Sequence, residues 1–174
     1  MENALEVKAK FQKVIYEDMN KKIRNATVTS YNNIVFKSRL EASVYNHLLQ
    51  SGFNPVYEGM KFTLWEGFKP TVPFYTKKGK NNVLNNKKTI DITYTPDFTF
   101  MYKNILVIIE VKGLQNDVFP YKFKMFRKIL EEKPYKDNTL LFEIFSIKQL
   151  KECIDIIKSY DPNRENEEAS SNST

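Results

Sequence analysis

The stretch that decides the fold reads Ile-Leu-Val-Ile-Ile-Glu-Val-Lys-Gly at residues 105–113. Five consecutive aliphatic residues, with a glycine closing the segment, are typical of a strand that is buried on both faces of a sheet. Glu110 and Lys112 are two residues apart near its end, so they point to the same face. Charged side chains are costly to bury there unless they have partners, and we therefore expect polar partners close to both.

The segment before this strand carries the first such partner. In IDITYTPDFTF at residues 90–100, even-numbered positions are mostly apolar and odd-numbered positions are polar, which predicts a half-buried strand. A short turn joins the two strands, so if Met101 lies opposite Leu106, then Asp97 lies opposite Glu110. The Cβ atoms of such a cross-strand pair are about 5 Å apart.

Two carboxylates at that distance repel each other unless a cation or a proton lies between them. Lys112 supplies part of the positive charge. A divalent ion that prefers oxygen ligands, such as Mg²⁺, is suited to supply the rest. The alternative is a structural Asp–Lys–Glu ion cluster at a strand end, and geometry alone favours neither interpretation.

Further elements are predicted around this hairpin. Apolar residues spaced by three and four predict an amphipathic helix at about residues 4–24, and a capping box, Ser38-x-x-Glu41, begins a helix that ends before Gly52. We expect one or two strands in 53–74, a solvated lysine-rich loop or hairpin tip in 76–88, a helix in 122–132, a strand in 138–146 and a helix in 147–160. This order predicts an α/β fold, with a mixed β-sheet flanked by helices in one domain at 1–160, and a disordered acidic tail at 161–174.

Composition excludes several chemistries. One His and one Cys cannot form a zinc cage or an internal disulfide, so we expect a reducing, cytoplasmic location. The longest aliphatic run is far too short to span a membrane, which predicts a soluble protein. The net charge is +6, and because the tail carries one Arg against four acidic residues, the first 160 residues carry +9. A basic body indicates a polyanionic partner. Trp65 is expected in the core.

Two motifs resemble a known family. Thr95-Pro96-Asp97-Phe98 and, after twelve residues between the acids, Glu110-Val111-Lys112 resemble the core of the PD-(D/E)xK nuclease superfamily. Upstream, the segments 36–41, 51–53 and 57–58 are similar to the opening of phage endonuclease I, a Holliday-junction resolvase of that superfamily. The resemblance implies a restriction-endonuclease-like core and a DNA substrate, namely branched DNA such as a Holliday junction. It also implies a homodimer, because symmetrical cutting of two strands needs two active sites.

Carried over residue by residue, the resemblance implies catalytic roles for Glu41, Asp97, Glu110 and Lys112. Asp97, Glu110, the carbonyl of Val111 and Glu41 would bind Mg²⁺ or Mn²⁺, which activates water for phosphodiester hydrolysis. Lys112 would orient that water or stabilise the phosphoryl oxygens. Glu41 also has a structural explanation, because its position in the capping box accounts for a glutamate without any catalysis.

Basic residues near these motifs are candidate phosphate contacts. They flank the start of the Glu41 helix or lie in the helix after the catalytic strand: Lys37, Arg39, Lys122, Lys124, Arg127 and Lys128. The alternative is a solvated cationic surface. Residues 68–92 are longer than their counterpart in endonuclease I, and the C-terminal portion differs, so both regions are candidates to contact DNA or set substrate choice. Two further functions stay open. These are a nicking, repair or transposition-associated nuclease, and a non-catalytic DNA-binding or assembly protein that keeps the fold.

Overall fold

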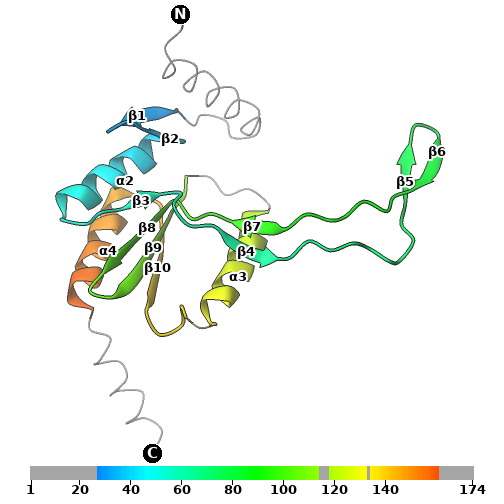
Figure 1. Cartoon of the computed structure of the whole chain (residues 1–174). Helices are drawn as coiled ribbons and strands as arrows, with labels where there is room; N and C mark the ends of the chain where they lie inside the picture. The colour runs from blue at the N-terminus through cyan, green and yellow to red at the C-terminus, as the bar shows by residue number, and fades with distance from the viewer. Residues whose placement is uncertain (1–26, 114–117, 133, 161–174) are drawn as a thin grey trace, which may run out of the picture. The chain divides into compact units, whose positions relative to one another are not determined.

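The computed structural model describes residues 27–113, 118–132 and 134–160 (Figure 1). The chain divides into two compact units, with the boundary between Ala42 and Ser43. The helix predicted at about residues 4–24 and the predicted acidic tail lie outside the described residues. None of the helices in the described ranges is long and apolar enough to cross a membrane.

In the first unit, β1 (Thr29–Tyr31) and β2 (Ile34–Phe36) form an antiparallel hairpin. Asn32 and Asn33 make its two-residue turn with φ of 50° and 61°. Positive φ at both central positions is what a tight hairpin turn requires, and asparagine tolerates it better than most residues.

Helix α2 (Arg39–Gln50) begins in the first unit and continues into the second. Its start is the predicted capping box, because Ser38 Oγ accepts a hydrogen bond from the Glu41 amide. Its end is set by Gly52 at φ +88°, with the Phe53 amide donating to the Leu48 carbonyl and the Gly52 amide to the Leu49 carbonyl. This pair of bonds is a Schellman motif, which supplies donors to carbonyls at the end of the helix that have no partner within it.

The second unit is built on a four-stranded sheet in the order β10-β9-β8-β3. These strands are β3 (Val56–Tyr57), β8 (Phe98–Tyr102), β9 (Ile105–Val111) and β10 (Thr139–Ile144). β10 runs parallel to β9, while β8 is antiparallel to both of its neighbours. The prediction of a mixed sheet in an α/β fold is therefore confirmed, and β9 is buried along its length as its aliphatic run predicts.

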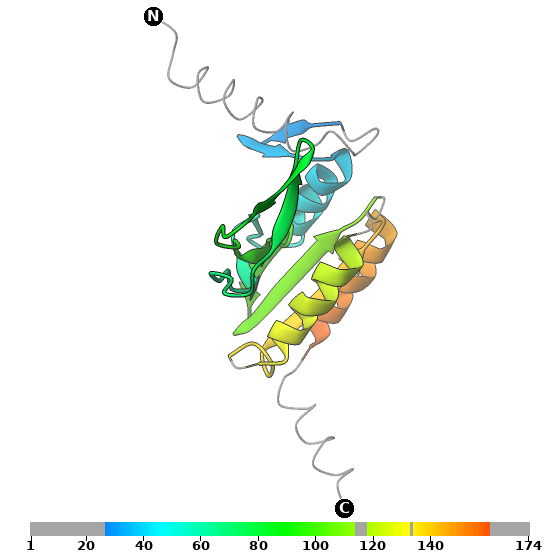
Figure 2. The same cartoon turned by 90° about the vertical axis from the view of Figure 1, so that its right-hand side faces the viewer.

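Helices α3 (Phe119–Leu130) and α4 (Ile147–Ser159) lie on opposite faces of this sheet (Figure 1 and Figure 2). On the α3 face, Ile108 of β9 packs in a core cluster with Phe119, Phe126 and Leu130 of that helix. Because side chains alternate along a strand, Glu110 points to the same face as Ile108. The sheet face beneath α3 is therefore the one that carries the charged end of β9.

Two predictions about this unit are wrong. The alternating segment is not one strand: β7 (Ile92–Tyr94) and β8 belong to different sheets, and the chain breaks between them at 95–97. Pro96 explains the break, because proline has no amide proton for a sheet ladder. Trp65 is not in the core but 57% exposed, because it ends a strand that leaves the sheet instead of crossing it.

That strand is β4 (Phe62–Trp65), which pairs with β7 in a two-stranded ribbon. Beyond the ribbon, the chain runs outward to a hairpin of β5 (Tyr75–Lys78) and β6 (Asn81–Leu84), seen at the far end of the green segment in Figure 1. Of the two interpretations of the lysine-rich segment, the hairpin tip is confirmed, because β5 pairs with β6 within it.

Candidate functional site

Asp97 lies in the break between β7 and β8, directly before the first residue of β8. Its Oδ2 accepts a hydrogen bond of 2.7 Å from the amide of Val111, and its backbone carbonyl accepts one of 2.8 Å from the amide of Glu58. β8 pairs with β9 in the predicted register, with Met101 opposite Leu106. Asp97 is therefore held beside the Glu110–Val111 end of β9, although it is not part of a strand.

Glu110 is 4% exposed, and its two carboxylate oxygens have different surroundings. Oε1 forms an ion pair of 2.5 Å with Nζ of Lys112. Oε2 is buried and has no hydrogen-bond partner among the described residues. Burial raises the pKa of Glu110. Lys112, and after it the Tyr94 hydroxyl and the Asp97 backbone, oppose that shift without cancelling it. Oε2 is thus buried close to neutral donors, without a cation of its own at hydrogen-bond distance among the described residues.

Lys112 is held by an aromatic ring as well as by Glu110. Its Nζ lies 3.8 Å from the ring centroid of Phe119, the first residue of α3, and its amide donates to the Ile144 carbonyl of β10. A cation over a ring face is attracted by the negative charge density there. The side chain keeps 18% of its surface exposed, so the ammonium stays within reach of a charged ligand.

Two further polar side chains reach this point. Glu143 of β10 pairs in register with Glu110, so the two carboxylates lie on neighbouring parallel strands. Tyr94 is buried and stacks on Phe126 with ring centroids 4.6 Å apart. Burial, followed by the charge of Glu110 and smaller contributions from Asp97 and Glu143, raises the pKa of Tyr94 well above its ordinary value. Its hydroxyl has no hydrogen bond of regular geometry within the described chain, despite this proximity to Glu110.

Glu143 and Tyr94 are not among the site residues predicted from the sequence. A signal for Glu143 was present, because it is the one charged residue in the apolar strand TLLFEI. Tyr94 could not be placed from the sequence, since its burial depends on α3 packing over β7.

Glu41 belongs to the first unit, where it makes the contacts of a helix cap. Its Oε1 accepts a hydrogen bond of 2.8 Å from the Ser38 hydroxyl, and its Oε2 accepts one of 3.0 Å from the Lys37 amide. Glu41 is 8% exposed. The structural explanation of this residue is therefore confirmed, and a catalytic role would be additional to it.

The donor atoms near β9 suit a hard cation. Asp97, Glu110 and the Val111 carbonyl offer oxygen ligands, and Mg²⁺ is commonly bound through one or two carboxylates together with water and phosphate oxygens. A cation at the buried Oε2 of Glu110 would supply the charge partner that this atom lacks. Within the described ranges, no three side chains of His, Cys, Asp or Glu converge as a complete metal cage.

The predicted phosphate contacts fall into separate groups. Lys124, Arg127 and Lys128 are exposed on α3 at spacings of three and four, which places them on neighbouring parts of the helix surface. Lys122 is partly buried and donates a hydrogen bond of 3.3 Å to the Thr93 carbonyl, which ties α3 to β7. Lys37 and Arg39 flank the cap of α2 in the first unit.

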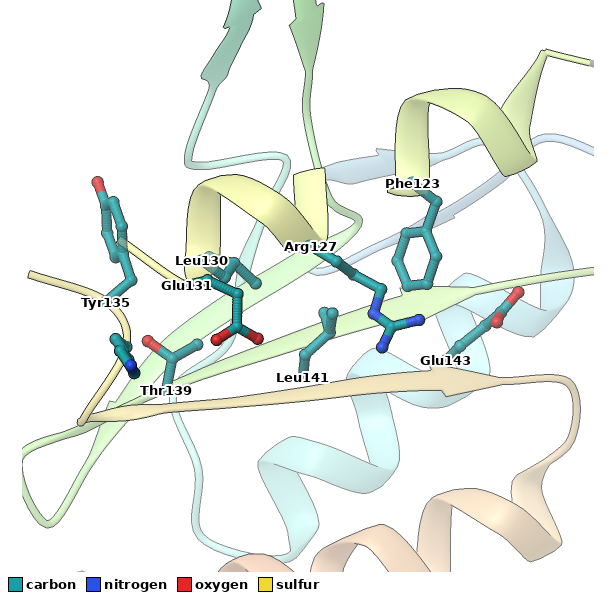
Figure 3. A pocket seen from close by; sticks show the side chains of 9 residues that line it. Phe123, Arg127, Leu130, Glu131, Tyr135, Thr139, Leu141 and Glu143 are labelled. Carbon is teal, nitrogen blue, oxygen red and sulfur yellow. The ribbon is translucent and has the colours of Figure 1, made fainter. Parts of the chain in front are cut away.

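A pocket of about 380 Å³ opens between α3 and β10 on the same face of the sheet (Figure 3). Arg127 and Phe123 line it from the helix, and Thr139 and Glu143 line it from the strand. Because Glu143 is also the neighbour of Glu110, the pocket ends beside the carboxylate site.

Comparison with known proteins assigns a family. No curated protein and no solved structure gives a significant match to the chain. A family model matches residues 20–152, a range that contains Glu41, Asp97, Glu110 and Lys112. Because that range is well over half of the sequence, the chain belongs to the family described as "Protein of unknown function (DUF1064)".

Proposed function

We propose that this protein is a metal-dependent endonuclease that hydrolyses DNA phosphodiester bonds, with a core like that of the PD-(D/E)xK nucleases and branched DNA as its preferred substrate. The observation that carries the proposal is the convergence of Asp97, Glu110 and Lys112 at one end of β9. The hydrogen bond from the Val111 amide holds Asp97 there, and Oε2 of Glu110 is buried with no hydrogen bond of regular geometry in the described chain.

Asp97, Glu110 and the Val111 carbonyl would hold Mg²⁺ or Mn²⁺. When bound, such an ion neutralises charge that develops on the phosphate and lowers the pKa of a water molecule. Contacts within the chain hold the two carboxylates in place before any ion binds. Asp97 is fixed by a backbone amide and Glu110 by its ion pair with Lys112, so neither carboxylate has to be immobilised when substrate arrives.

The role of Lys112 follows from its position between an anion and an aromatic ring. Glu110 and Phe119 hold the ammonium at the end of β9, and its partial exposure leaves it accessible to a phosphate oxygen. A fixed positive charge stabilises the extra negative charge of a phosphoryl transition state more than that of the ground state. Glu41 would contribute a further carboxylate, as the resemblance implies.

Cleavage assays test this proposal. The full chain is incubated with a four-way junction, a flap, linear duplex and single-stranded DNA, in Mg²⁺ and in EDTA. The proposal predicts cleavage that requires the metal and is fastest on the junction. Absence of metal-dependent cleavage on all four substrates would refute the nuclease. Equal rates on junction and linear duplex would refute the branched preference and favour a nicking, repair or transposition-associated enzyme.

One observation favours a second candidate function, a DNA-binding or assembly protein without catalysis. Lys112 already neutralises part of the Glu110 charge through a direct ion pair, so the cluster has a purely structural use. The two functions differ in their response to metal. A structural cluster predicts DNA binding with no cleavage and no increase in thermal stability when Mg²⁺ is added.

A further inference from the structure

The segment between β4 and β7 forms an arm, defined here as residues 67–90, that plays no part in the carboxylate site. The arm contains six lysines and no acidic residue, and all six lysines are exposed: Lys69, Lys77, Lys78, Lys80, Lys87 and Lys88. Its charge of +6 equals the net charge of the whole chain, because the remaining 21 basic and 21 acidic residues cancel. The net positive charge of this protein is therefore that of the arm.

At the base of the arm, hydrogen bonds join the outgoing segment at 67–68 to the returning segment at 89–91. The Gly67 amide donates to Asp91 Oδ1 at 2.7 Å, and the Thr89 amide donates to the Phe68 carbonyl at 2.8 Å. A Cβ atom on Gly67 would lie 2.3 Å from the Thr89 carbonyl oxygen, so only glycine allows this approach. The arm is thus a defined structure and not merely a long connection.

The tip is a regular hairpin that pairs only with itself in the described chain. β5 and β6 are joined by Gly79 and Lys80, and Gly79 has φ +63°, as a two-residue turn with glycine first requires. Alternation puts Tyr75 and Lys77 on one face and Lys78 on the other, so both faces of the ribbon are basic.

Large apolar side chains on the arm are exposed, because no other described element covers the faces of the hairpin. They are Phe68 at 50%, Val72 at 77%, Phe74 at 58%, Tyr75 at 62%, Leu84 at 54% and Ile90 at 87% exposed. An isolated hairpin is only marginally stable in water, and exposed apolar surface of this extent marks a contact site. A charge of +6 with no acidic residue favours an anionic partner, and it opposes contact with the arm of a second copy, which would bring +6 against +6.

We propose that the arm is a duplex-DNA-binding element, in which its lysines contact the phosphates beside a groove and its exposed aromatic residues pack against sugars and base edges. The major groove of B-DNA admits a two-stranded β-ribbon. Extended chain from Gly67 to Gly79 reaches at most about 40 Å, which is comparable to one helical turn of DNA. The inference deepens the proposed function, on which it rests only for the choice of DNA as the polyanion.

Binding measured in EDTA tests the arm separately from catalysis. Fluorescence anisotropy of a labelled duplex is followed for the full chain and for Lys77→Gln/Lys80→Gln over about 50–200 mM salt. The slope of log K against log salt is negative, and each lost phosphate contact makes it about 0.9 less steep. The double variant should therefore have a slope about 1.8 less steep than the unmodified chain, and it should bind several-fold more weakly. Lys148→Gln/Lys151→Gln, on exposed positions of α4, is the matched control and should leave the slope unchanged.

Two outcomes of that experiment overturn the proposal. One is an equal slope for the arm variant and the unmodified chain, and the other is an equal reduction by the α4 control. Equal affinity for duplex RNA, or for vesicles containing phosphatidylglycerol, would also overturn it, because the arm would then be a general anion-binding surface. If the full chain binds duplex through the arm but cleaves none of the four DNA substrates, the proposed nuclease is refuted and the assignment of the arm stands.

A label at the tip gives an independent measurement. Asn82→Cys, in a Cys153→Ala background, carries an environment-sensitive fluorophore on β6, and Lys151→Cys carries the same fluorophore on α4. Addition of duplex should change the emission of the label on Asn82→Cys and not that of the label on Lys151→Cys. A response from α4 alone would overturn the proposal. Circular dichroism of each variant checks that the fold is retained.

Discussion

Asp97 and Val111 are joined by a hydrogen bond of 2.7 Å from the Val111 amide to the Asp97 carboxylate, across the break that Pro96 introduces between two strands. The bond places a carboxylate beside Glu110 without making Asp97 part of the sheet ladder. It also gives Asp97 a structural task that can be separated from its charge.

The first prediction separates that task from catalysis. Asp97→Asn keeps an oxygen that accepts the Val111 amide, so the free energy of unfolding should change by less than about 1 kcal/mol. Loss of the charge should lower the cleavage rate by about 100-fold or more. Asp97→Ala is the control, because it leaves the amide without its partner and should cost about 1–3 kcal/mol. Chemical denaturation and junction cleavage measure the two effects, and full cleavage by Asp97→Asn would contradict the prediction.

The second prediction concerns the pH dependence of stability in EDTA. Because burial raises the pKa of Glu110, the folded chain retains that proton to a higher pH than the unfolded chain does. Protonation of Glu110 therefore stabilises the folded chain at acid pH, and this contribution to the free energy of unfolding is lost as pH rises through the Glu110 pKa. Wild type should lose stability relative to Glu110→Gln over that interval, as measured by urea denaturation at a series of pH values. Parallel pH profiles for the two proteins would be inconsistent with the raised pKa.

The third prediction is a thermal shift caused by metal. A divalent ion bound to the folded state alone stabilises it by about 1.4 kcal/mol at ten times its dissociation constant. Mg²⁺ should thus raise the melting temperature of wild type by a few degrees. Glu110→Gln should show little or no shift, because it removes the buried anionic oxygen. Differential scanning fluorimetry measures both, with Glu152→Gln on exposed α4 as a control that should respond like wild type.

The fourth prediction separates the cap role of Glu41 from a catalytic role. Ser38→Ala removes the cap hydroxyl but keeps the carboxylate, so it should cost about 1 kcal/mol of stability and retain cleavage. Glu41→Gln keeps an acceptor for the cap but loses the charge, so it should be nearly as stable as wild type and lose cleavage. If both variants cleave at the wild-type rate, Glu41 is a structural residue only.

The fifth prediction concerns the basic surface of α3. Lys124→Gln/Lys128→Gln should weaken DNA binding and raise KM, because exposed lysines contact phosphates in both the ground state and the transition state. The turnover number should change little. Lys122→Gln is expected to act differently, since it removes a hydrogen bond to the Thr93 carbonyl and should lower stability. Steady-state kinetics and thermal denaturation distinguish the two kinds of residue.

The sequence by itself determined the elements whose signals are local. The aliphatic run of β9 predicted a strand buried on both faces, and a short turn predicted its register with β8, because side-chain alternation and turn length act over a few residues. The start and end of α2 were predictable for the same reason, since Ser38, Glu41 and Gly52 act on neighbouring backbone groups.

The tertiary structure alone decided the features that depend on residues far apart in the chain. Pro96 turned one apparent strand into two, and Trp65 became exposed because β4 continues into the arm rather than into the sheet. Glu143 reached Glu110 only through parallel pairing of β10 with β9, and Phe119 reached Lys112 only through the placement of α3. Burial and charge interactions depend on the distance between atoms in space, and no local pattern of residues encodes that distance for segments that meet only in the folded chain.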